Sequence, residues 1–282
     1  MSKITLVTDS TAYIPPDLVA RYGIVVAPQI LIWGNENFRD GVDISPTEFY
    51  TRLKSAKIMP SSSQVTPKTF YEIFKTEIDQ GNQVLAILIS TDLSGTITSA
   101  VQAKQLLPGV GIEIVDSRTT AMAMGYQTLL AARAIEQGAN LAEAKALAEE
   151  STSHTGVIFA VDTLEFLHRG GRIGGGARFL GSALQLKPIL EVTGGKVDGI
   201  EKVRTRGKSL NRVVELIVDR IAGRTPLHLA TLHANAPDDA RILLDEVSKQ
   251  VHPQESVLAE VSPVVGTHAG PGTVGLAFLA GM

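Results

Sequence analysis

The hydrophobic pattern in the first half of the chain alternates between short apolar runs and amphipathic stretches. Residues 84–89 are six consecutive apolar residues with many branched side chains, which is typical of a strand buried on both faces. A polar loop and a segment with helical spacing at 96–107 follow it, and the apolar runs at 3–7 and 112–115 also lead into polar loops. Alternating strands and helices of this kind predict a doubly wound, mostly parallel sheet.

Capping signals and periodicity predict the other elements of this half. The apolar run 24–33 predicts one strand, residues 34–37 a turn, and the proline-bounded segment 59–67 a polar loop. Ser45-Pro46-Thr47-Glu48 has the spacing of a capping box, with proline at the first helical position. Helices are predicted at 17–22, 45–56, 69–79, 121–137 and 141–151.

The pattern changes near residue 153. Segments 188–192 and 197–205 flank Gly194-Gly195 and predict a hairpin, which favours a mixed or antiparallel sheet. We therefore expect two α/β domains, one at residues 1–153 and one at 154–282. Further strands are predicted at 156–161, 227–232 and 256–261, and helices at 209–222 and 237–250.

Composition excludes several classes of function. The chain has no cysteine, so it has no disulfide, no thiolate metal site and no cysteine nucleophile, and its six histidines lack the spacing of metal ligands. A net charge of −3 and 5% aromatic residues argue against nucleic-acid binding. No apolar run approaches the roughly 18 residues of a membrane span, and the first residues lack the pattern of a signal peptide. We expect a cytoplasmic protein without stable membrane insertion.

Polar loops follow three of the predicted parallel strands. Asp9-Ser10-Thr11 follows the first strand, Ser94-Gly95-Thr96 follows the central one, and Asp116-Ser117-Arg118-Thr119-Thr120 follows the third. The carboxyl ends of parallel strands meet at one edge of a sheet, where α/β proteins bind anionic groups. Taken alone, Ser94-Gly95-Thr96 fits an ordinary helix cap equally well.

Two glycine-rich segments carry candidate chemistry. Arg169-Gly170-Gly171-Arg172 offers bidentate donors for phosphate or carboxylate, but it fits neither the P-loop nor the dinucleotide-binding spacing, and a plain flexible turn is the alternative. The closing segment 265–278 holds Thr267 and His268 among glycines. A histidine so placed, at the end of a strand, is expected to lie outside the core. The absence of a Gly-x-Ser-x-Gly elbow argues against an α/β-hydrolase.

In order along the chain, these motifs together resemble the DegV family of bacterial fatty-acid-binding proteins. The resemblance runs from Thr8-Asp9-Ser10-Thr11 to Gly266–Gly272 and includes Ser62-Ser63-Gln64 and Leu164–Gly175. It implies two α/β domains with a fatty-acid tunnel between them. The residues that it assigns to the carboxylate are Ser62, Ser94 and His268. It assigns supporting roles to Asp9, Ser10, Thr11, Ser63, Gln64, Gly95, Thr96, Thr119 and Thr267, and a partner or gating loop to Arg169, Gly170, Gly171 and Arg172.

The resemblance further implies a carrier without catalytic residues, metal or cofactor, whose ligand is a long-chain fatty acid. Such a carrier presents the acid to a separate fatty acid kinase that makes acyl-phosphate for phospholipid synthesis. An acid of about 16 to 18 carbons buries about 14 methylenes, worth on the order of 11 kcal/mol before the costs of association. A hydroxyl-to-carboxylate hydrogen bond contributes only about 1.5–3 kcal/mol, so the tail sets affinity and the serines set where the head lies.

Two other functions remain open at this point. One is a phosphotransferase subunit resembling the dihydroxyacetone kinases, with a small polar ligand and His268 as the working residue. The other is a regulatory module whose ligand reports lipid status. A monomer is expected in each case.

Overall fold

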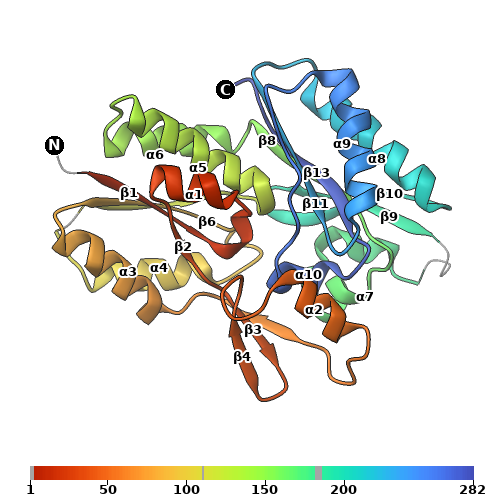
Figure 1. Ribbon diagram of the computed structural model, residues 1–282, viewed down its shortest axis with the longest axis horizontal. Helices are drawn as coiled ribbons and strands as arrows, with labels where there is room; N and C mark the ends of the chain where they lie inside the picture. Colours follow the sequence, from red (N-terminus) through yellow and green to blue (C-terminus); the bar gives the residue numbers. More distant parts are fainter. Residues whose placement is uncertain (1–2, 110, 182–185) are drawn as a thin grey trace.

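Two large β-sheets, a third small one and the helices around them form the described part of the molecule (Figure 1). The structure, a computed structural model, describes residues 3–109, 111–181 and 186–282. The first sheet is parallel throughout, with the strand order β2-β1-β6-β7. Its strands are β1 (Ile4–Asp9), β2 (Val25–Ala27), β6 (Gln83–Leu88) and β7 (Ile112–Asp116).

Alternation along the central strand β6 explains why helices cover both faces of this sheet. Val84 and Leu88 pack in the cluster formed with α3 and α4, whereas Leu85 and Ile87 pack in the cluster formed with α5 and α6. Successive side chains of a strand point to opposite faces, so a strand that is apolar at every position requires cover on both. These helices are α1 (Pro16–Tyr22), α3 (Pro67–Asp79), α4 (Thr96–Gln105), α5 (Ala121–Glu136) and α6 (Leu141–Ser151).

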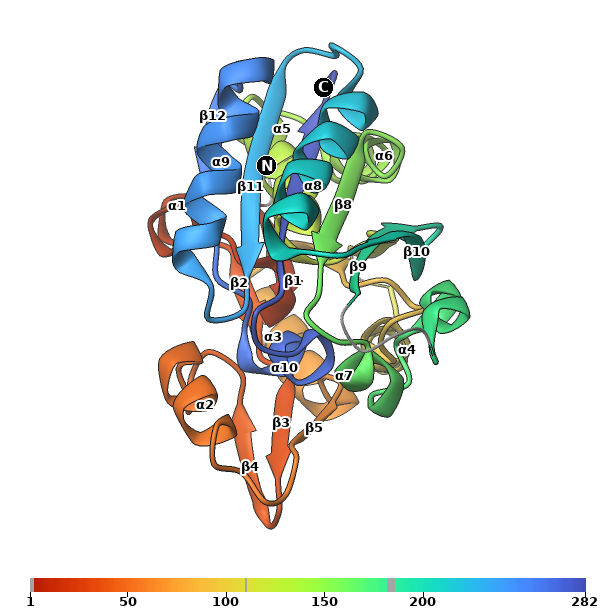
Figure 2. The same cartoon turned by 90° about the vertical axis from the view of Figure 1, so that its right-hand side faces the viewer.

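The second sheet is mixed, with the strand order β10-β9-β8-β13-β11-β12. Helices α8 (Arg206–Ile221) and α9 (Pro237–Val251) cover one of its faces, as Figure 2 shows. Helix α5 contacts β8, β11 and β13 as well as β1 and β6, so it lies between the two sheets. The strands are β8 (Thr155–Ala160), β9 (Lys187–Thr193), β10 (Lys196–Val203), β11 (Leu227–His233), β12 (Glu255–Val257) and β13 (Val274–Ala280).

A third, small antiparallel sheet corrects the prediction for the segment 24–33. The run is two strands, because β2 belongs to the parallel sheet while β3 (Ile30–Trp33) pairs with β4 (Glu36–Arg39) and β5 (Ser61–Ser63). The extended segment is interrupted at Pro28, which has no backbone N–H to donate to a neighbouring strand. Segment 59–67 is likewise not entirely a loop, because it contains β5, in which Ser62 pairs with Leu31 of β3. Helix α2 (Pro46–Leu53) has the predicted capping box.

The closing segment also differs from its prediction. It contains the helix α10 (Pro263–Ala269) and the strand β13, which lies between β8 and β11 inside the mixed sheet. Glycine residues inside both elements weaken their helix and strand patterns in the sequence. At Gly275 a Cβ would lie 2.3 Å from the carbonyl oxygen of Ile158, so the glycine permits close pairing with β8. His268 is therefore in a helix and not at a strand end.

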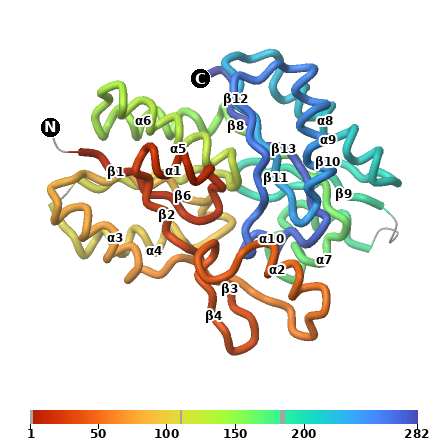
Figure 3. Tube along the Cα trace, viewed as in Figure 1, coloured from red at the N-terminus to blue at the C-terminus, as the bar shows by residue number. Residues whose placement is uncertain are grey.

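The predicted fold class is confirmed: a parallel sheet forms the N-terminal part and a mixed sheet the C-terminal part. The trace in Figure 3 shows the chain passing from one part to the other after α6. The boundary between residues 153 and 154 stays a prediction. Within the described residues, no helix is both long enough and apolar enough to cross a membrane. Short helices complete the fold: η1 (Ser10–Ala12), α7 (Glu165–Arg169) and η2 (Gly174–Phe179).

Candidate functional site

An apolar cavity lies between the carboxyl edge of the parallel sheet and the inner face of the mixed sheet. About 790 Å³ within it is not filled by protein atoms, and part of this space is open to solvent. The loops after β1, β6 and β7 line one side, and the strands of the mixed sheet line the other. Its apolar wall includes Ile89, Val157, Phe159, Val192, Val197 and Leu232. A cavity with such a wall suits an extended hydrocarbon chain.

The three residues predicted to bind a carboxylate line this one cavity. Ser62 comes from β5, Ser94 from the loop between β6 and α4, and His268 from α10. The Oγ of Ser62 lies 2.6 Å from Nε2 of His268, although 206 positions separate them in the chain. The fold thus places two hydroxyls and an imidazole at a largely apolar space. Their role toward a carboxylate stays a prediction.

His268 is neutral at physiological pH. Burial, together with the positive charge of Arg172, lowers its pKa from 6.5 to about 4. Its Nδ1 has no hydrogen-bond partner among the described residues and faces Gly170, where a Cβ would lie only 2.1 Å away. An unpartnered N–H in that confined place would be costly, so we infer that the proton is on Nε2. Nε2 then donates to Ser62, whose own hydroxyl proton is free to donate to a ligand.

Ser94 lines the cavity and lies next to the start of α4, whose N-cap residue is Gly95. Its Oγ accepts from the backbone N–H of Thr96 at 3.3 Å and lies 2.9 Å from Oγ1 of Thr96. Gly95 allows the turn to approach the neighbouring loop, because a Cβ there would lie 3.1 Å from the side-chain amide of Gln64. The two interpretations of Ser94-Gly95-Thr96 are therefore compatible, and Gln64 lines the same cavity.

Asp9 supports the cavity from behind. Its carboxylate accepts hydrogen bonds from the backbone and hydroxyl of Thr11, from Nε2 of Gln29 and from the backbone N–H of Ile89. Burial raises the pKa of Asp9, and these hydrogen bonds only partly oppose that effect. Thr11, Gln29 and Ile89 line the cavity whereas Asp9 does not. Asp9 therefore holds three lining residues in place by hydrogen bonds and does not itself face the cavity.

Three of the predicted supporting residues take part in strand pairing or in hydrogen bonds with nearby residues. Ser63 pairs with Ile30 in the small sheet, the backbone of Thr119 accepts from Ser117, and Oγ1 of Thr267 donates to the carbonyl of Pro263. None of these three lines the cavity, and Thr120 lies there instead of Thr119. Sequence reasoning missed Thr120, Gln29 and the apolar wall of the mixed sheet. Only the position of Thr120 in a loop after a strand was a usable signal.

The Arg169–Arg172 loop lies at the end of the cavity that Ser62 and His268 line, which we call its polar end. Arg172 lines the cavity and donates from Nε to the carbonyl of Leu93 at 3.0 Å, and from Nη1 to that of Gly170 at 2.7 Å. Arg169 pairs with Glu165 at the surface. A second, surface groove contains Arg169, Met59 and Phe166 and shares Ser62, Arg172 and His268 with the cavity. The polar end of the cavity is thus next to a groove on the outside of the molecule.

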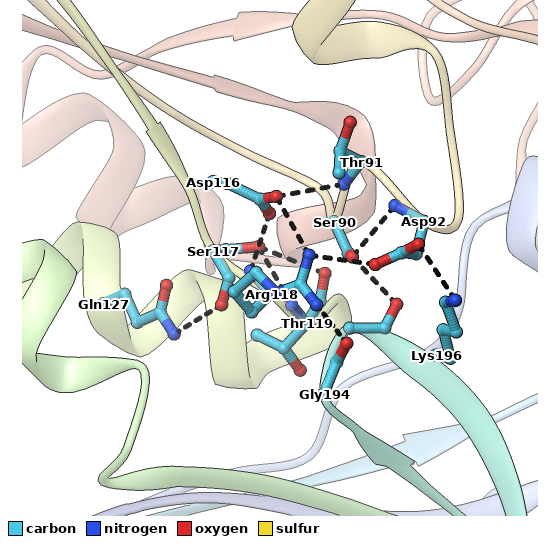
Figure 4. Close-up of polar contacts among 11 residues, drawn as sticks. Ser90, Thr91, Asp92, Asp116, Ser117, Arg118, Thr119, Gln127, Gly194 and Lys196 are labelled. Atoms are coloured by element: carbon cyan, nitrogen blue, oxygen red, sulfur yellow. Dashed lines mark hydrogen bonds and ion pairs between the residues drawn. The ribbon is translucent and has the colours of Figure 1, made fainter.

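Figure 4 shows a polar cluster that fastens the β9–β10 hairpin to the parallel sheet. Arg118, which has a left-handed backbone with φ of 54°, donates to the carbonyl of Gly194 and pairs with Asp92 at 2.9 Å. Oγ of Ser90 donates to the carbonyl of Gly195 at 2.8 Å, and Lys196 pairs with Asp92 at 3.4 Å. The strands of this hairpin supply Val192 and Val197 to the cavity wall. The cluster therefore joins the two sides of the cavity.

A metal centre does not form within the part of the chain that the structure describes. No three His, Asp or Glu side chains there come together in a group that could hold a metal ion.

Comparisons with known proteins identify the family. The model of the family described as "Uncharacterised protein, DegV family" matches residues 3–281. A DegV domain-containing protein of Streptomyces coelicolor is 36% identical over 275 residues, which is 97% of each chain. A DegV family protein from Thermus thermophilus, described as fatty-acid binding, has a similar structure, with a TM-score of 0.93, 33% identity and coverage of 99% of each chain. DegV of Bacillus subtilis, described as a fatty acid binding protein, has a TM-score of 0.88 and 29% identity, with coverage of 99% of this chain and 100% of its own. The chain is a member of the DegV family.

Proposed function

We propose that this protein binds a long-chain fatty acid, with the tail in the apolar cavity and the carboxylate held by Ser62, Ser94 and His268. The observation that carries the proposal is the cavity itself, an apolar space bordered by two hydroxyls and a neutral imidazole. The relatives from Thermus thermophilus and Bacillus subtilis, both described as fatty-acid binding, support it.

The tail supplies the affinity. Each methylene transferred from water to such a wall contributes about 0.8 kcal/mol, and a large share of the sum offsets the ordering of ligand and protein. Hydrogen bonds at the head add about 1.5–3 kcal/mol each. Because they are directional, these bonds determine which end of the acid lies near the surface groove.

The head is held by neutral donors. In the protein without ligand the pKa of His268 is about 4, so the site that receives the carboxylate at pH 7 has a neutral imidazole. The guanidinium of Arg172 lines the same cavity but donates to the carbonyls of Leu93 and Gly170. We infer that the carboxylate forms no tight ion pair with it, so that a carboxylate oxygen keeps its electron density and can attack a phosphoryl donor. The surface groove that shares Ser62, Arg172 and His268 with the cavity offers a route by which a donor approaches. We infer that a separate fatty acid kinase uses this route to form acyl-phosphate.

The apolar wall favours an acyl chain over a small polar metabolite. A polar ligand in the space bounded by Val157, Phe159 and Leu232 would lose its hydrogen bonds to water and find few replacements there. This disfavours the phosphotransferase alternative with a small polar substrate.

Calorimetric titration of delipidated protein with palmitate tests the proposal. We expect one acid per chain. Val192→Trp places a large ring in the cavity and is expected to abolish binding, whereas Val203→Trp, farther along the same hairpin and outside the cavity lining, is the matched control. Wild-type affinity in Val192→Trp would place the ligand elsewhere, and no heat with wild-type protein would reject the proposal.

A further inference from the structure

The first turn of α10, the helix that carries His268, is held by a distant carboxylate. Ser262 is its N-cap residue, but the side chain of Ser262 makes no capping hydrogen bond. Instead, Oδ1 of Asp40 accepts from the backbone N–H of Val264 at 3.2 Å. Asp40 precedes Val264 by 224 positions and follows directly after β4. A residue of the N-terminal half thus supplies the hydrogen-bond acceptor that the side chain of an N-cap residue ordinarily supplies.

Asp40 is itself fixed in the loops behind the cavity. Its Oδ2 accepts from Oγ of Ser10 at 2.7 Å, and its backbone N–H donates to the carbonyl of Gln29 at 2.8 Å. Only 2% of Asp40 is exposed. A buried carboxylate is costly, and burial raises its pKa to about 6. The carboxylate therefore occupies this place at a cost in stability, which suggests that its acceptor geometry is needed there.

The position of α10 determines the position of His268. Val264 and His268 are four residues apart, one helical turn, and both line the cavity. One face of the helix packs closely on α2, because a Cβ at Gly266 would lie 2.4 Å from the hydroxyl of Tyr50. Figures 2 and 3 both show α10, near the end of the chain, beside α2 and β3.

We propose that Asp40 is a positioning residue of the headgroup site: by holding the first turn of α10 it sets the contact between His268 and Ser62. That contact is 2.6 Å, so a shift of the helix by about 1 Å takes it out of hydrogen-bond range. Helix α10 has seven residues, so its first turn and His268 belong to one short hydrogen-bonded element, which contacts α7, β5, α2 and β3. The consequence for a bound carboxylate rests on the function proposed above, whereas the positioning of His268 does not.

Nitrogen-15 NMR of the His268 ring in delipidated protein, with Asp40→Ala and Asp40→Asn, tests the inference. Asn keeps an oxygen for the N–H of Val264, and its amide can donate to Ser10, whereas Ala removes both contacts. We expect Ala to shift the Nε2 resonance and to move the pKa of His268 toward its ordinary value, and Asn to restore both. With palmitate labelled at its carboxyl carbon, Ala is expected to weaken retention about tenfold and to shift the carbon resonance, again with rescue by Asn.

The controls separate positioning from general loss of stability. Leu243→Ala removes a buried side chain from α9, in a cluster away from the site, and should lower the melting temperature without changing His268. If Asp40→Ala also lowers the melting temperature and leaves the His268 resonance unchanged, the proposal is wrong. If Asp40→Ala does not fold, Gly266→Ala, which pushes α10 from α2, must shift the His268 resonance, and an unchanged resonance contradicts the proposal. If palmitate does not bind the wild-type protein, the proposed function fails, while the ligand-free resonances still decide the role of Asp40.

Discussion

At the scale of the residue, the site depends on a histidine that stays neutral and a serine whose proton is free. With the proton on Nε2, as inferred above, His268 donates to Ser62, and Ser62 can then donate to a ligand that only accepts. Ser94 adds a second hydroxyl from another loop. Ser62, Ser94 and His268 are uncharged at pH 7, and the guanidinium of Arg172 lines the same cavity while donating to the carbonyls of Leu93 and Gly170.

Ser94→Ala is expected to weaken fatty-acid retention modestly and to impair acyl-phosphate formation more strongly. The tail contacts remain, so the loss is about that of one hydrogen bond, while the head loses its orientation toward the phosphoryl donor. Retention is measured by titration with palmitate, and turnover with a fatty acid kinase and ATP. Unchanged turnover would reject the assignment of Ser94.

Two buried groups are expected to oppose each other in the dependence of stability on pH. The folded-state pKa of His268 is lowered to about 4, so its contribution is present above its ordinary pKa of 6.5 and is lost as the pH falls through 4. The folded-state pKa of Asp40 is raised from 3.8 to about 6, so its contribution is present at low pH and is lost as the pH rises through 6. Each effect is on the order of 3 kcal/mol.

Single variants should therefore separate the two effects. Relative to wild type, His268→Gln should gain stability as the pH falls from 7 to about 4.5, and Asp40→Asn should lose it. Urea unfolding at both pH values measures the difference, and groups that are common to all three proteins, such as Asp9 and Arg172, cancel in it. The same pH response in all three proteins would contradict these pKa shifts.

At the scale of the element, short segments that meet through tertiary contacts build the polar end. Strand β5, helix α10 and the loop after α7 each have seven or fewer residues, and each depends on its neighbours for its place. Gly170 shows how closely they pack. Its φ is not positive, so alanine fits the backbone, but a Cβ would lie 2.1 Å from Nδ1 of His268.

Gly170→Ala is expected to displace the His268 ring and to destabilise the fold by about 1–3 kcal/mol, the usual cost of overpacking. Fatty-acid retention should fall with it. Gly207→Ala is the matched control, because a Cβ at this position in α8 meets nothing within 4 Å. Thermal unfolding and palmitate titration measure the two effects, and equal behaviour of the two variants would contradict the packing seen at Gly170.

Local signals explain which elements could be predicted from the sequence. The strand at 84–89 and the capped helix after Ser45 carry their patterns in a few consecutive residues, and both formed as predicted. Strand β5 is Ser-Ser-Ser and has no apolar signal, because its conformation comes from pairing with β3. Helix α10 was missed because Gly266, which lowers helix propensity, is present for its close contact with Tyr50.

The candidate site could be predicted only in part for the same reason. Ser62, Ser94 and His268 were named because a family resemblance joined motifs that are weak one by one. The resemblance implied a tunnel, but the residues of its apolar wall were not predicted, since Val157 and Phe159 look in the sequence like any other residues of a core strand. Asp40 lacked any signal at all, because its partner Val264 lies 224 positions away.

At the scale of the whole molecule, the cavity exists because two sheets face each other and are held together. Helix α5 packs between them, and the cluster around Arg118 fastens the β9–β10 hairpin to the loops after β6 and β7 (Figure 4). The hairpin turn fits this cradle closely, since a Cβ at Gly195 would lie 2.6 Å from Oγ of Ser90. Loosening the turn should therefore loosen one wall of the cavity.

Arg118→Ala is expected to speed dissociation of a bound fatty acid about threefold to tenfold with little change in secondary structure, because it removes two ion pairs and a hydrogen bond that are partly exposed. Arg178→Ala is the control, because Arg178 pairs with Asp198 on the same hairpin and not with a residue of the cluster around Arg118. Stopped-flow release of a fluorescent fatty acid measures both. Equal release rates in the two variants would show that the cluster does not hold the wall.

The most direct test of fatty-acid binding is denaturing extraction of the purified protein, followed by mass spectrometry of the extract. The arrangement of cavity, hydroxyls and neutral histidine predicts a long-chain fatty acid near one equivalent per chain, greatly reduced in Val192→Trp. A small polar metabolite in its place, or an extract equal to that of Val192→Trp, would contradict it.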